Sequence, residues 1–229
     1  GQKTYVVTEF TGSTPTSFTI SSNTDADNRA DYNLSSLDLT LTNDFAVGNE
    51  DGSSPENIYL GALILNHATG ITINVYKNST LTVKSLVMGE NDVINVAPGA
   101  KLIVDGEQGI TAPVVTNLVI GAQEGNMGKF LFSPTVTSNR HPNATVNFIS
   151  KSYRVSANDL TWQRFGVPTF GAPASFTCNT PGITTYVYVW NNSANKWDQL
   201  GKVGDAGLKE QLNVPFAGYD MLCNAAAGG

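Results

Sequence analysis

The sequence predicts an all-β protein, in which a solenoid of stacked short coils precedes a smaller β module. Three observations favour this fold class: strand-like segments recur at a regular spacing, turn-forming residues separate them, and aromatic residues gather toward the C-terminal end. The composition agrees, because 41% of the residues are apolar, only 14% are charged and 22 are glycines. This mixture is typical of many short strands joined by turns, and it argues against a disordered chain or a helical bundle.

The clearest repeat is the pair INVYKNSTLTV and INVAPGAKLIV, which begin at residues 73 and 94 and are therefore 21 residues apart. The same step, taken along the chain, predicts three ladders of apolar side chains. Their members are Leu39, Leu60, Leu81 and Leu102 in the first, Ile73 with Ile94 and Val75 with Val96 in the second, and Leu65 with Leu86 in the third. The segments 76–79 and 97–100, Tyr-Lys-Asn-Ser and Ala-Pro-Gly-Ala, favour turns between the strands.

Apolar residues alternate within each segment, so that Leu81 and Val83 face one side of a strand while Thr80 and Thr82 face the other. A unit this short cannot bury its inner side alone, but copies stacked about 4.8 Å apart bury each other's apolar side chains. The sequence therefore predicts a β-solenoid, and its coil with inward aliphatic ladders resembles the right-handed parallel β-helix family. An antiparallel sandwich with similar strand spacing is the alternative.

The predicted solenoid spans residues 34–150 and contains about five or six coils. Asn74 and Asn95 are expected on its outer side, where they can form a short amide ladder. Phe130 lies 28 residues after Leu102, which predicts one coil that carries an insertion.

Residues 1–33 are expected to cap the exposed strand edges of the first coil. The oxygen-bearing residues of their polar loop are Asp25, Asp27, Asn28 and Asp31, and a calcium loop needs such donors. However, Arg29 occupies a position where calcium loops usually place another oxygen donor, and the expected glycine is absent. A solvated acidic loop is therefore preferred, with calcium as the alternative, and no other cofactor is expected.

Residues 151–229 form the predicted module, which is small, β-sandwich-like and rich in aromatic residues. Of the 21 aromatic residues of the chain, 11 lie at or after Tyr153, including all three tryptophans. The stretch YVYVWNNSANKWDQL (186–200) has the pattern of a β-hairpin, with two strands around a polar turn. Rings exposed on this module could stack on sugar rings, and the candidates are Trp162, Tyr188, Trp190 and Trp197. The alternative is that these rings form the core of the module.

A tryptophan followed by a Gly-Val-Pro segment, a YVYVWN hairpin with a second tryptophan, and a later Pro-Phe-x-Gly-Tyr occur in residues 160–222. This arrangement resembles a β module found after β-helix repeats in secreted and cell-surface proteins of Bacteroidetes. The resemblance implies an exported protein, located at the cell surface or outside the cell. In that family the strand that begins at Gly-Tyr usually continues into further strands, so we expect either a fragment or a module completed by a partner.

Charge and hydropathy exclude two classes of partner. The chain has 13 lysines and arginines against 19 aspartates and glutamates, a net charge of −6, and no basic stripe. We therefore expect no nucleic-acid partner, because binding to phosphates depends on clustered cations. No apolar run approaches the roughly 18 to 20 residues that cross a bilayer, so no membrane span is expected.

The sequence contains no G-x-S-x-G nucleophile elbow, phosphate-binding loop or dinucleotide-binding fingerprint. His67 and His141 are 74 residues apart and lack nearby cysteines or paired carboxylates, so they predict no zinc site. Enzymes that cleave polysaccharides on a β-helix need carboxylates placed together on consecutive coils, and a 21-residue step aligns no such pair. Cys178 and Cys223 allow either one disulfide or two buried thiols.

The sequence thus predicts a non-catalytic exported protein, adhesion-like or structural, at the cell surface or outside the cell. Its expected partners are a surface glycan, a protein, or the remainder of a larger surface assembly. The alternative is a glycan-binding or polysaccharide-cleaving accessory protein.

Overall fold

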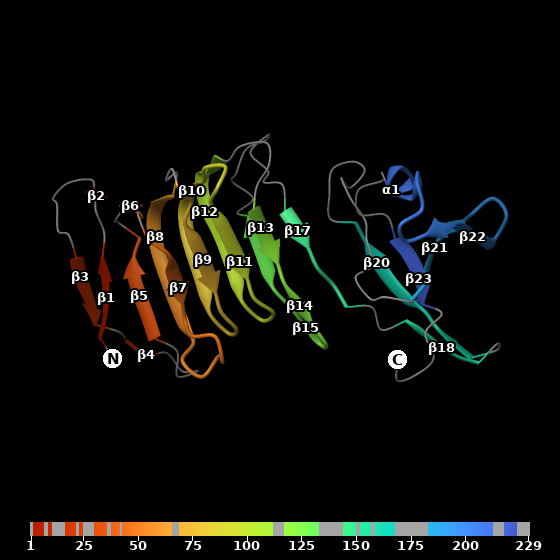
Figure 1. Ribbon diagram of the computed structural model, residues 1–229, viewed down its shortest axis with the longest axis horizontal. Coiled ribbons are helices and arrows are strands. Elements are labelled where there is room, and N and C mark those ends of the chain that lie inside the picture. The colour runs from red at the N-terminus through yellow and green to blue at the C-terminus, as the bar shows by residue number, and fades with distance from the viewer. Residues whose placement is uncertain are drawn as a thin grey trace. The chain divides into compact units, whose positions relative to one another are not determined.

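The structure is a computed structural model. It describes residues 2–6, 9–10, 17–21, 23–24, 30–35, 38–41, 43–65, 69–111, 117–132, 144–149, 152–156, 159–167, 183–212 and 218–223. The chain divides into two compact units, Gly1–Ile149 and Ser150–Gly229, which are treated separately below (Figure 1).

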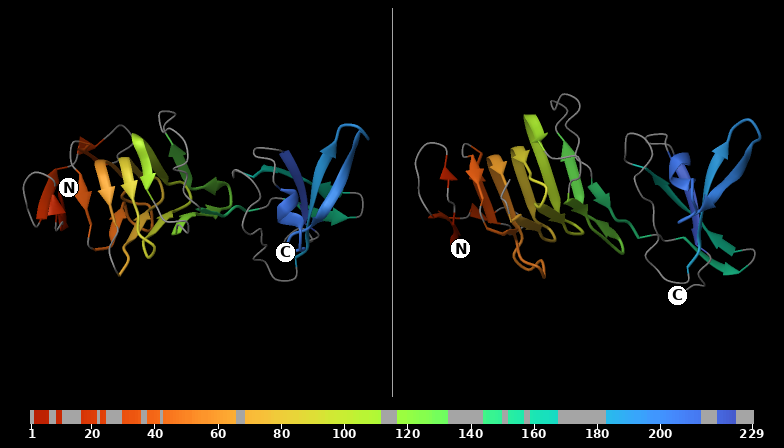
Figure 2. Two further views of the ribbon diagram at one scale, coloured as in Figure 1. Left: turned by 90° about the horizontal axis from the view of Figure 1, so that it is seen from above. Right: turned by 45° about the horizontal axis from the view of Figure 1, so that its top comes forward.

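The first unit is a parallel β-solenoid of about four turns. One of its sheets stacks β5 (Ala30–Leu34), β8 (Glu56–Ile64), β10 (Thr80–Val87), β12 (Lys101–Thr111) and β16 (Lys129–Phe132) in this order. The other stacks β7 (Phe45–Val47), β9 (Thr72–Val75), β11 (Val93–Val96), β13 (Asn117–Ile120) and β17 (Ala144–Val146). The chain alternates between the two sheets, and all neighbours within each of these stacks are parallel (Figure 2). The predicted solenoid is therefore confirmed, with about four turns instead of the five or six coils expected.

Short strands precede and interrupt the stack. They are β1 (Gln2–Val6) paired with β3 (Ser17–Ser21), β2 (Glu9–Phe10) paired with β6 (Leu39–Thr40), β4 (Asn23–Thr24) paired with β5, and β14 (Ala122–Gln123) paired with β15 (Asn126–Met127). All four of these pairs are antiparallel, unlike the stack itself.

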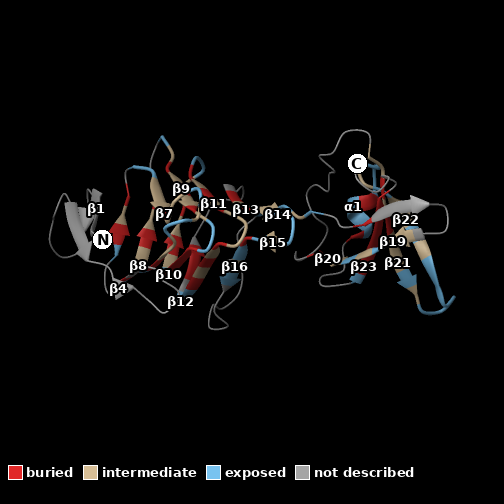
Figure 3. Cartoon of the chain, turned by 90° about the horizontal axis from the view of Figure 1, so that it is seen from below, coloured by how far each residue is buried: buried red, intermediate tan, exposed pale blue. Residues whose placement is uncertain are grey.

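Inward aliphatic ladders form the core of the solenoid, and Figure 3 shows buried residues along its strands. Leu81 lies beside Leu102, and Ile73 lies beside Ile94, as the 21-residue repeat predicts. On the outer side, the Asn95 amide donates to Asn74 Oδ1 at 2.9 Å, so the predicted amide ladder is present.

The solenoid bends once within β10, and this bend creates a third inward face. Leu81 and Val83 point inward, Lys84 is exposed, and Leu86 points inward again, which breaks the two-residue alternation. Leu86 lies beside Leu63 of β8. The predicted pairing of Leu86 with Leu65 is therefore wrong by two residues.

The register of the first ladder differs from the prediction on its N-terminal side. Leu81 lies beside Ile58, which precedes it by 23 residues, while Leu60 lies beside Val83. Leu39 lies beside Leu63 and belongs to the third face. The 21-residue step therefore relates only the central coils, because loops of different length separate the others.

The predicted insertion before Phe130 is confirmed. Leu102 pairs with Phe130. Some of the additional residues lie in a bulge of β12, where Val104 and Gly109 pair with Val83 and Ser85, and the others lie in the antiparallel hairpin β14–β15, between β13 and β16.

Equivalent turns connect the two sheets in the central coils. Ser79 N donates to Tyr76 O at 3.0 Å, and Ala100 N donates to Ala97 O at 2.9 Å. The third residues of these turns, Asn78 and Gly99, have φ values of 65° and 83°. A positive φ at this position is what a type II turn requires, and asparagine and glycine tolerate it best.

The second unit contains a four-stranded antiparallel sheet in the order β20 (Gln163–Gly166), β23 (Gly218–Cys223), β21 (Thr185–Asn191) and β22 (Lys196–Lys202). A separate ribbon pairs β18 (Tyr153–Ser156) with β19 (Asp159–Thr161), and α1 is a single turn, Leu208–Gln211. The described residues of this unit form one main sheet with this helix, and the sandwich-like arrangement stays a prediction. No described helix is long and apolar enough to span a membrane.

One side of this sheet is buried. Its core contains Val167, Val187, Leu208, Leu212 and Tyr219, with Phe165, Val189, Leu200 and Val203 packed against it. The single-turn helix therefore supplies Leu208, and the residue after it supplies Leu212, to cover the inner side of the sheet.

Candidate ligand-binding face

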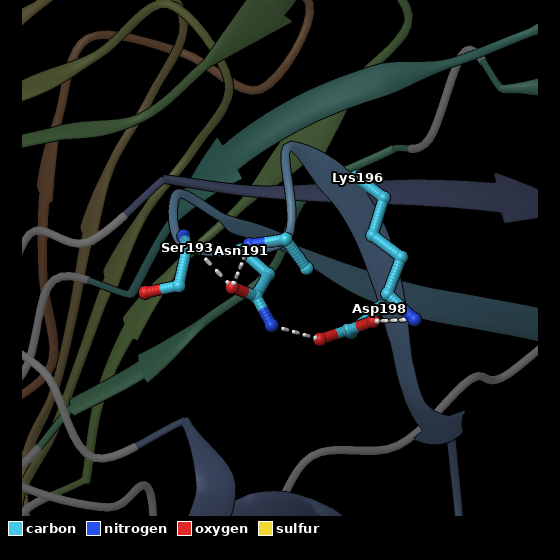
Figure 4. A network of polar contacts seen from close by, with 5 residues as sticks. Asn191, Ser193, Lys196 and Asp198 are labelled. Atoms are coloured by element: carbon cyan, nitrogen blue, oxygen red, sulfur yellow. Dashed lines mark hydrogen bonds and ion pairs between the residues drawn. The ribbon is translucent and has the colours of Figure 1, made fainter.

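The hairpin between β21 and β22 is held by a polar network at its turn (Figure 4). Asn191 Oδ1 accepts hydrogen bonds from the backbone N–H groups of Ser193 and Ala194, both at 3.0 Å. Its amide donates to Asp198 Oδ2 at 2.7 Å, and Lys196 Nζ lies 3.2 Å from Asp198 Oδ1. These contacts, the Asn191 hydrogen bond first, lower the pKa of Asp198. The network fixes the register in which Trp190 lies opposite Trp197.

Strand β21 places its valines in the core of the sheet and its large aromatic rings on the opposite side. Val187 is fully buried on the inner side of the sheet, whereas Tyr188 and Trp190 point to the other side, where Trp190 is 40% exposed. Burying an aromatic ring removes more apolar area from water than burying valine, so stability alone favours the opposite orientation. The strand thus exposes its largest rings while smaller residues fill the core.

Strand pairing brings polar residues to the same side as these rings. Arg164 lies opposite Asp220, Asp220 opposite Tyr188, and Tyr188 opposite Gln199, so all four side chains share one side of the sheet. The members of this side, which we call the aromatic face, are Trp162, Arg164, Tyr186, Tyr188, Trp190, Trp197, Gln199 and Lys202, together with the buried residues Asp220 and Leu222 of β23. All four residues suggested for sugar stacking therefore lie on one face.

The rings of the aromatic face meet edge to face. Trp162 and Tyr188 have centroids 4.9 Å apart at 78°, and Trp190 and Trp197 have centroids 5.4 Å apart at 67°. Trp162 and Trp197 are 41% and 37% exposed, so the alternative in which the tryptophans form the module's core is wrong. The Tyr188 hydroxyl donates to Gln199 Oε1 at 3.1 Å, and desolvation by burial, followed by the charge of Tyr186, raises the pKa of Tyr188.

Arg164 lies among these rings. Its Nε donates to Asp220 Oδ1 at 3.1 Å and its Nη2 to Asp220 Oδ2 at 3.5 Å. Its Cζ lies 5.8 Å from the Trp197 ring centroid, within the range of a cation–π contact. The hydrogen bond and the charge of Asp220 raise the pKa of Arg164, so the guanidinium stays charged. The sequence does not predict this pair, because 56 residues separate its members. It does place Trp162 and Arg164 on the same side of a strand, since they are two residues apart.

The residues considered for calcium do not form a described site. Asp25, Asp27 and Asn28 lie outside the described residues, and Asp31 lies in strand β5, where its backbone pairs with Asn57 rather than forming a loop. Within the described part of the chain, no group of three His, Cys, Asp or Glu residues is arranged to hold a metal ion.

The histidines and one cysteine also fall outside the described residues, namely His67, His141 and Cys178. The other cysteine, Cys223, is buried, and its Sγ lies 3.3 Å from Ser152 Oγ and 3.1 Å from Thr185 Oγ1. These contacts join strand β23 to β21 and to the residue before β18, which indicates a structural role.

No protein-family model, curated protein or solved structure matches this chain.

Proposed function

We infer that the protein is a non-catalytic, adhesion-like protein of the cell surface or extracellular space, and that its aromatic face binds a glycan. In this proposal the solenoid is a stiff spacer, and the second unit carries the binding site. The export and the surface location are supported by the resemblance of residues 160–222 to modules of secreted proteins.

The observation that supports glycan binding is the exposure of three tryptophans on one face, while Val187, Leu208, Leu212 and Tyr219 fill the core on the other side of the sheet. A pyranose ring has an apolar C–H side, which packs against an aromatic ring, and hydroxyl groups at its rim, which need planar polar partners. The aromatic face offers both, because the exposed side chains of Arg164 and Gln199 lie on the same side of the sheet as the rings. Ligand sites commonly combine apolar contact area with a few directed polar groups.

A purely structural explanation accounts for only part of this arrangement. A cross-strand pair such as Trp190 with Trp197 stabilises a hairpin by about 0.5–1.5 kcal/mol beyond its buried area. Trp162 forms a similar pair with Tyr188, but pair stabilisation does not explain why all three tryptophans remain 37–41% exposed on one side of the sheet. Exposed apolar groups gathered in one place are typical of interaction sites.

The solenoid supports the role of a spacer. Its two sheets share one continuous core, from Tyr32 in β5 to Ile120 in β13, so that each coil is supported by its neighbours. Within the described residues, three of its carboxylates, Asp38, Asp44 and Asp92, accept backbone hydrogen bonds, which is a structural use of these groups.

The test is a glycan array that covers plant, mucin and capsular polysaccharides. Trp190→Ala is expected to weaken binding to any glycan recognised by the wild-type protein by at least about tenfold, as loss of a central aromatic contact does. Tyr59→Ala is the matched control, because Tyr59 is an exposed ring of similar accessibility on the solenoid and should leave binding unchanged. Circular dichroism establishes that both variants are folded.

Two results would contradict the proposal. Unchanged binding in both Trp162→Ala and Trp190→Ala would show that the aromatic face is not the site. Release of soluble sugar from any of these polysaccharides would show that the protein is an enzyme.

A further inference from the structure

The charge that the aromatic face presents to solvent is positive, although the chain as a whole carries a net charge of −6. Among the described residues, its cations are Arg164 and Lys202 and its one carboxylate is Asp220. The Arg164 side chain is 71% exposed, whereas that of Asp220 is only 11% exposed. A ligand that approaches this face therefore meets the guanidinium before it meets the carboxylate.

The orientation of Arg164 leaves one of its hydrogen-bonding edges available. A guanidinium has five N–H donors in a rigid plane, and it can bind a carboxylate through Nε with one Nη or through its two Nη atoms. Asp220 takes the edge formed by Nε and Nη2. No described residue accepts from the other edge, formed by Nη1 and the second N–H of Nη2. That edge matches the spacing of the two oxygens of a further carboxylate.

The surroundings of both cations favour a carboxylate that belongs to a sugar ring. Arg164 lies over the Trp197 ring, and Lys202 Nζ lies 6.0 Å from the centroid of Tyr186. Each cation is thus next to an aromatic ring on which a pyranose could pack. An acidic sugar could contact an aromatic ring and its neighbouring cation at the same time, with the sugar ring packed against the aromatic side chain and the carboxylate bound to the cation.

We propose that the aromatic face selects acidic glycans, in which a uronic acid carboxylate binds the outer Nη1–Nη2 edge of Arg164 while the sugar ring packs against the neighbouring tryptophan. This inference rests on the proposed glycan-binding function and specifies its ligand. Asp220 is a positioning residue in this scheme, because it holds the guanidinium in place without touching the ligand.

The experiment compares uronic acid oligosaccharides with their methyl esters, which keep the same sugar backbone and lose the charge. Calorimetry with galacturonate, glucuronate and mannuronate oligomers is expected to give at least about tenfold tighter binding of the acid form, because a hydrogen-bonded charge pair is lost in the ester. Raising the salt concentration should weaken the acid form more than the ester. Arg164→Gln is expected to bring the ratio of the two affinities close to one.

Lys84→Gln is the matched control, since it removes one exposed cation from the solenoid and should leave the ratio as in the wild type. If acid and ester bind the wild type equally, and Trp190→Ala weakens both, the acidic preference is overturned while glycan binding stands. If no array glycan, acidic or neutral, binds the wild type, glycan binding itself is overturned. If poly-glutamate binds as tightly as the acid oligomers, the sugar ring is not recognised and this inference is overturned.

Discussion

Asp92 shows what a single buried carboxylate contributes to the solenoid. Its side chain is fully buried, and its two oxygens accept hydrogen bonds from Ile71 N at 2.8 Å and Gly89 N at 2.6 Å. Ile71 belongs to the preceding coil, so the carboxylate ties two coils together. Gly70, next to Ile71, has a φ of 78°, and a Cβ there would lie 2.3 Å from Asn91 O, so this corner accepts only glycine without rearrangement.

Asp92→Ala is expected to lower the free energy of unfolding by about 2–4 kcal/mol, because it leaves the buried N–H of Ile71 and the partly buried N–H of Gly89 without their acceptor. Urea denaturation measures this loss. Asp44→Ala is the matched control: Asp44 Oδ1 accepts from Thr72 N at 2.8 Å, but this site is exposed and water can replace the carboxylate, so a loss below about 1 kcal/mol is expected. Equal losses in the two variants would mean that burial does not determine the effect.

The residues of the candidate site were only partly predictable. Alternation in YVYVWN places Tyr188 and Trp190 on one side of a strand, whatever the fold. Which side is buried depends on the residues that cover it, and hydrophobicity alone would place the rings inside. Leu208 and Leu212, which follow the hairpin in the chain, cover the valine side instead. Which side of the strand is buried is therefore determined by tertiary packing, and the local sequence pattern does not predict it.

At the scale of whole elements, the register of the solenoid illustrates a similar limit. Alternation identifies inward residues, but it does not distinguish two registers that differ by two residues, since both keep the same side chains inside. The 21-residue step therefore predicts that Leu60 lies beside Leu81, whereas in the structure it lies beside Val83. The predicted pairing of Leu81 with Leu102 is correct because the turns at 76–79 and 97–100 have the same length. The pairing of β9 with β11 therefore continues in the same register into that of β10 with β12.

The β21–β22 hairpin allows a test by pH. Because the folded-state pKa of Asp198 is lowered, its contacts stabilise the hairpin above the ordinary pKa of an aspartate, and this stabilisation is lost as the pH falls through the lowered value. Asn191→Ala removes the hydrogen bond that contributes most, so the pKa of Asp198 should rise toward its ordinary value, as measured by NMR titration of the side-chain carboxyl. Lys196→Ala should raise it less. The reverse order would assign the main role to the ion pair.

At the scale of the whole molecule, each unit has its own hydrophobic core, one centred on residues such as Leu81 and Leu102, the other on Val187 and Tyr219. A solenoid core is continuous along its axis, so damage in a central coil affects its neighbours on both sides. The antiparallel sheet of the second unit does not depend on those ladders for its buried side. The two units are therefore expected to lose structure separately when one core is damaged.

Leu81→Asp tests this expectation, because it buries a carboxylate in a ladder where Ile58 and Leu102 are its neighbours. The substitution should destabilise the first unit by more than about 4 kcal/mol, as an unpaired buried charge does. Hydrogen exchange followed by mass spectrometry should then show lost protection across β8, β10 and β12, with β21 and β23 still protected. Lys84→Asp, at the exposed bend of the same strand, should change neither unit. Protection lost in both units of Leu81→Asp would show that the second sheet requires the solenoid to fold, and a glycan site on it would then depend on both.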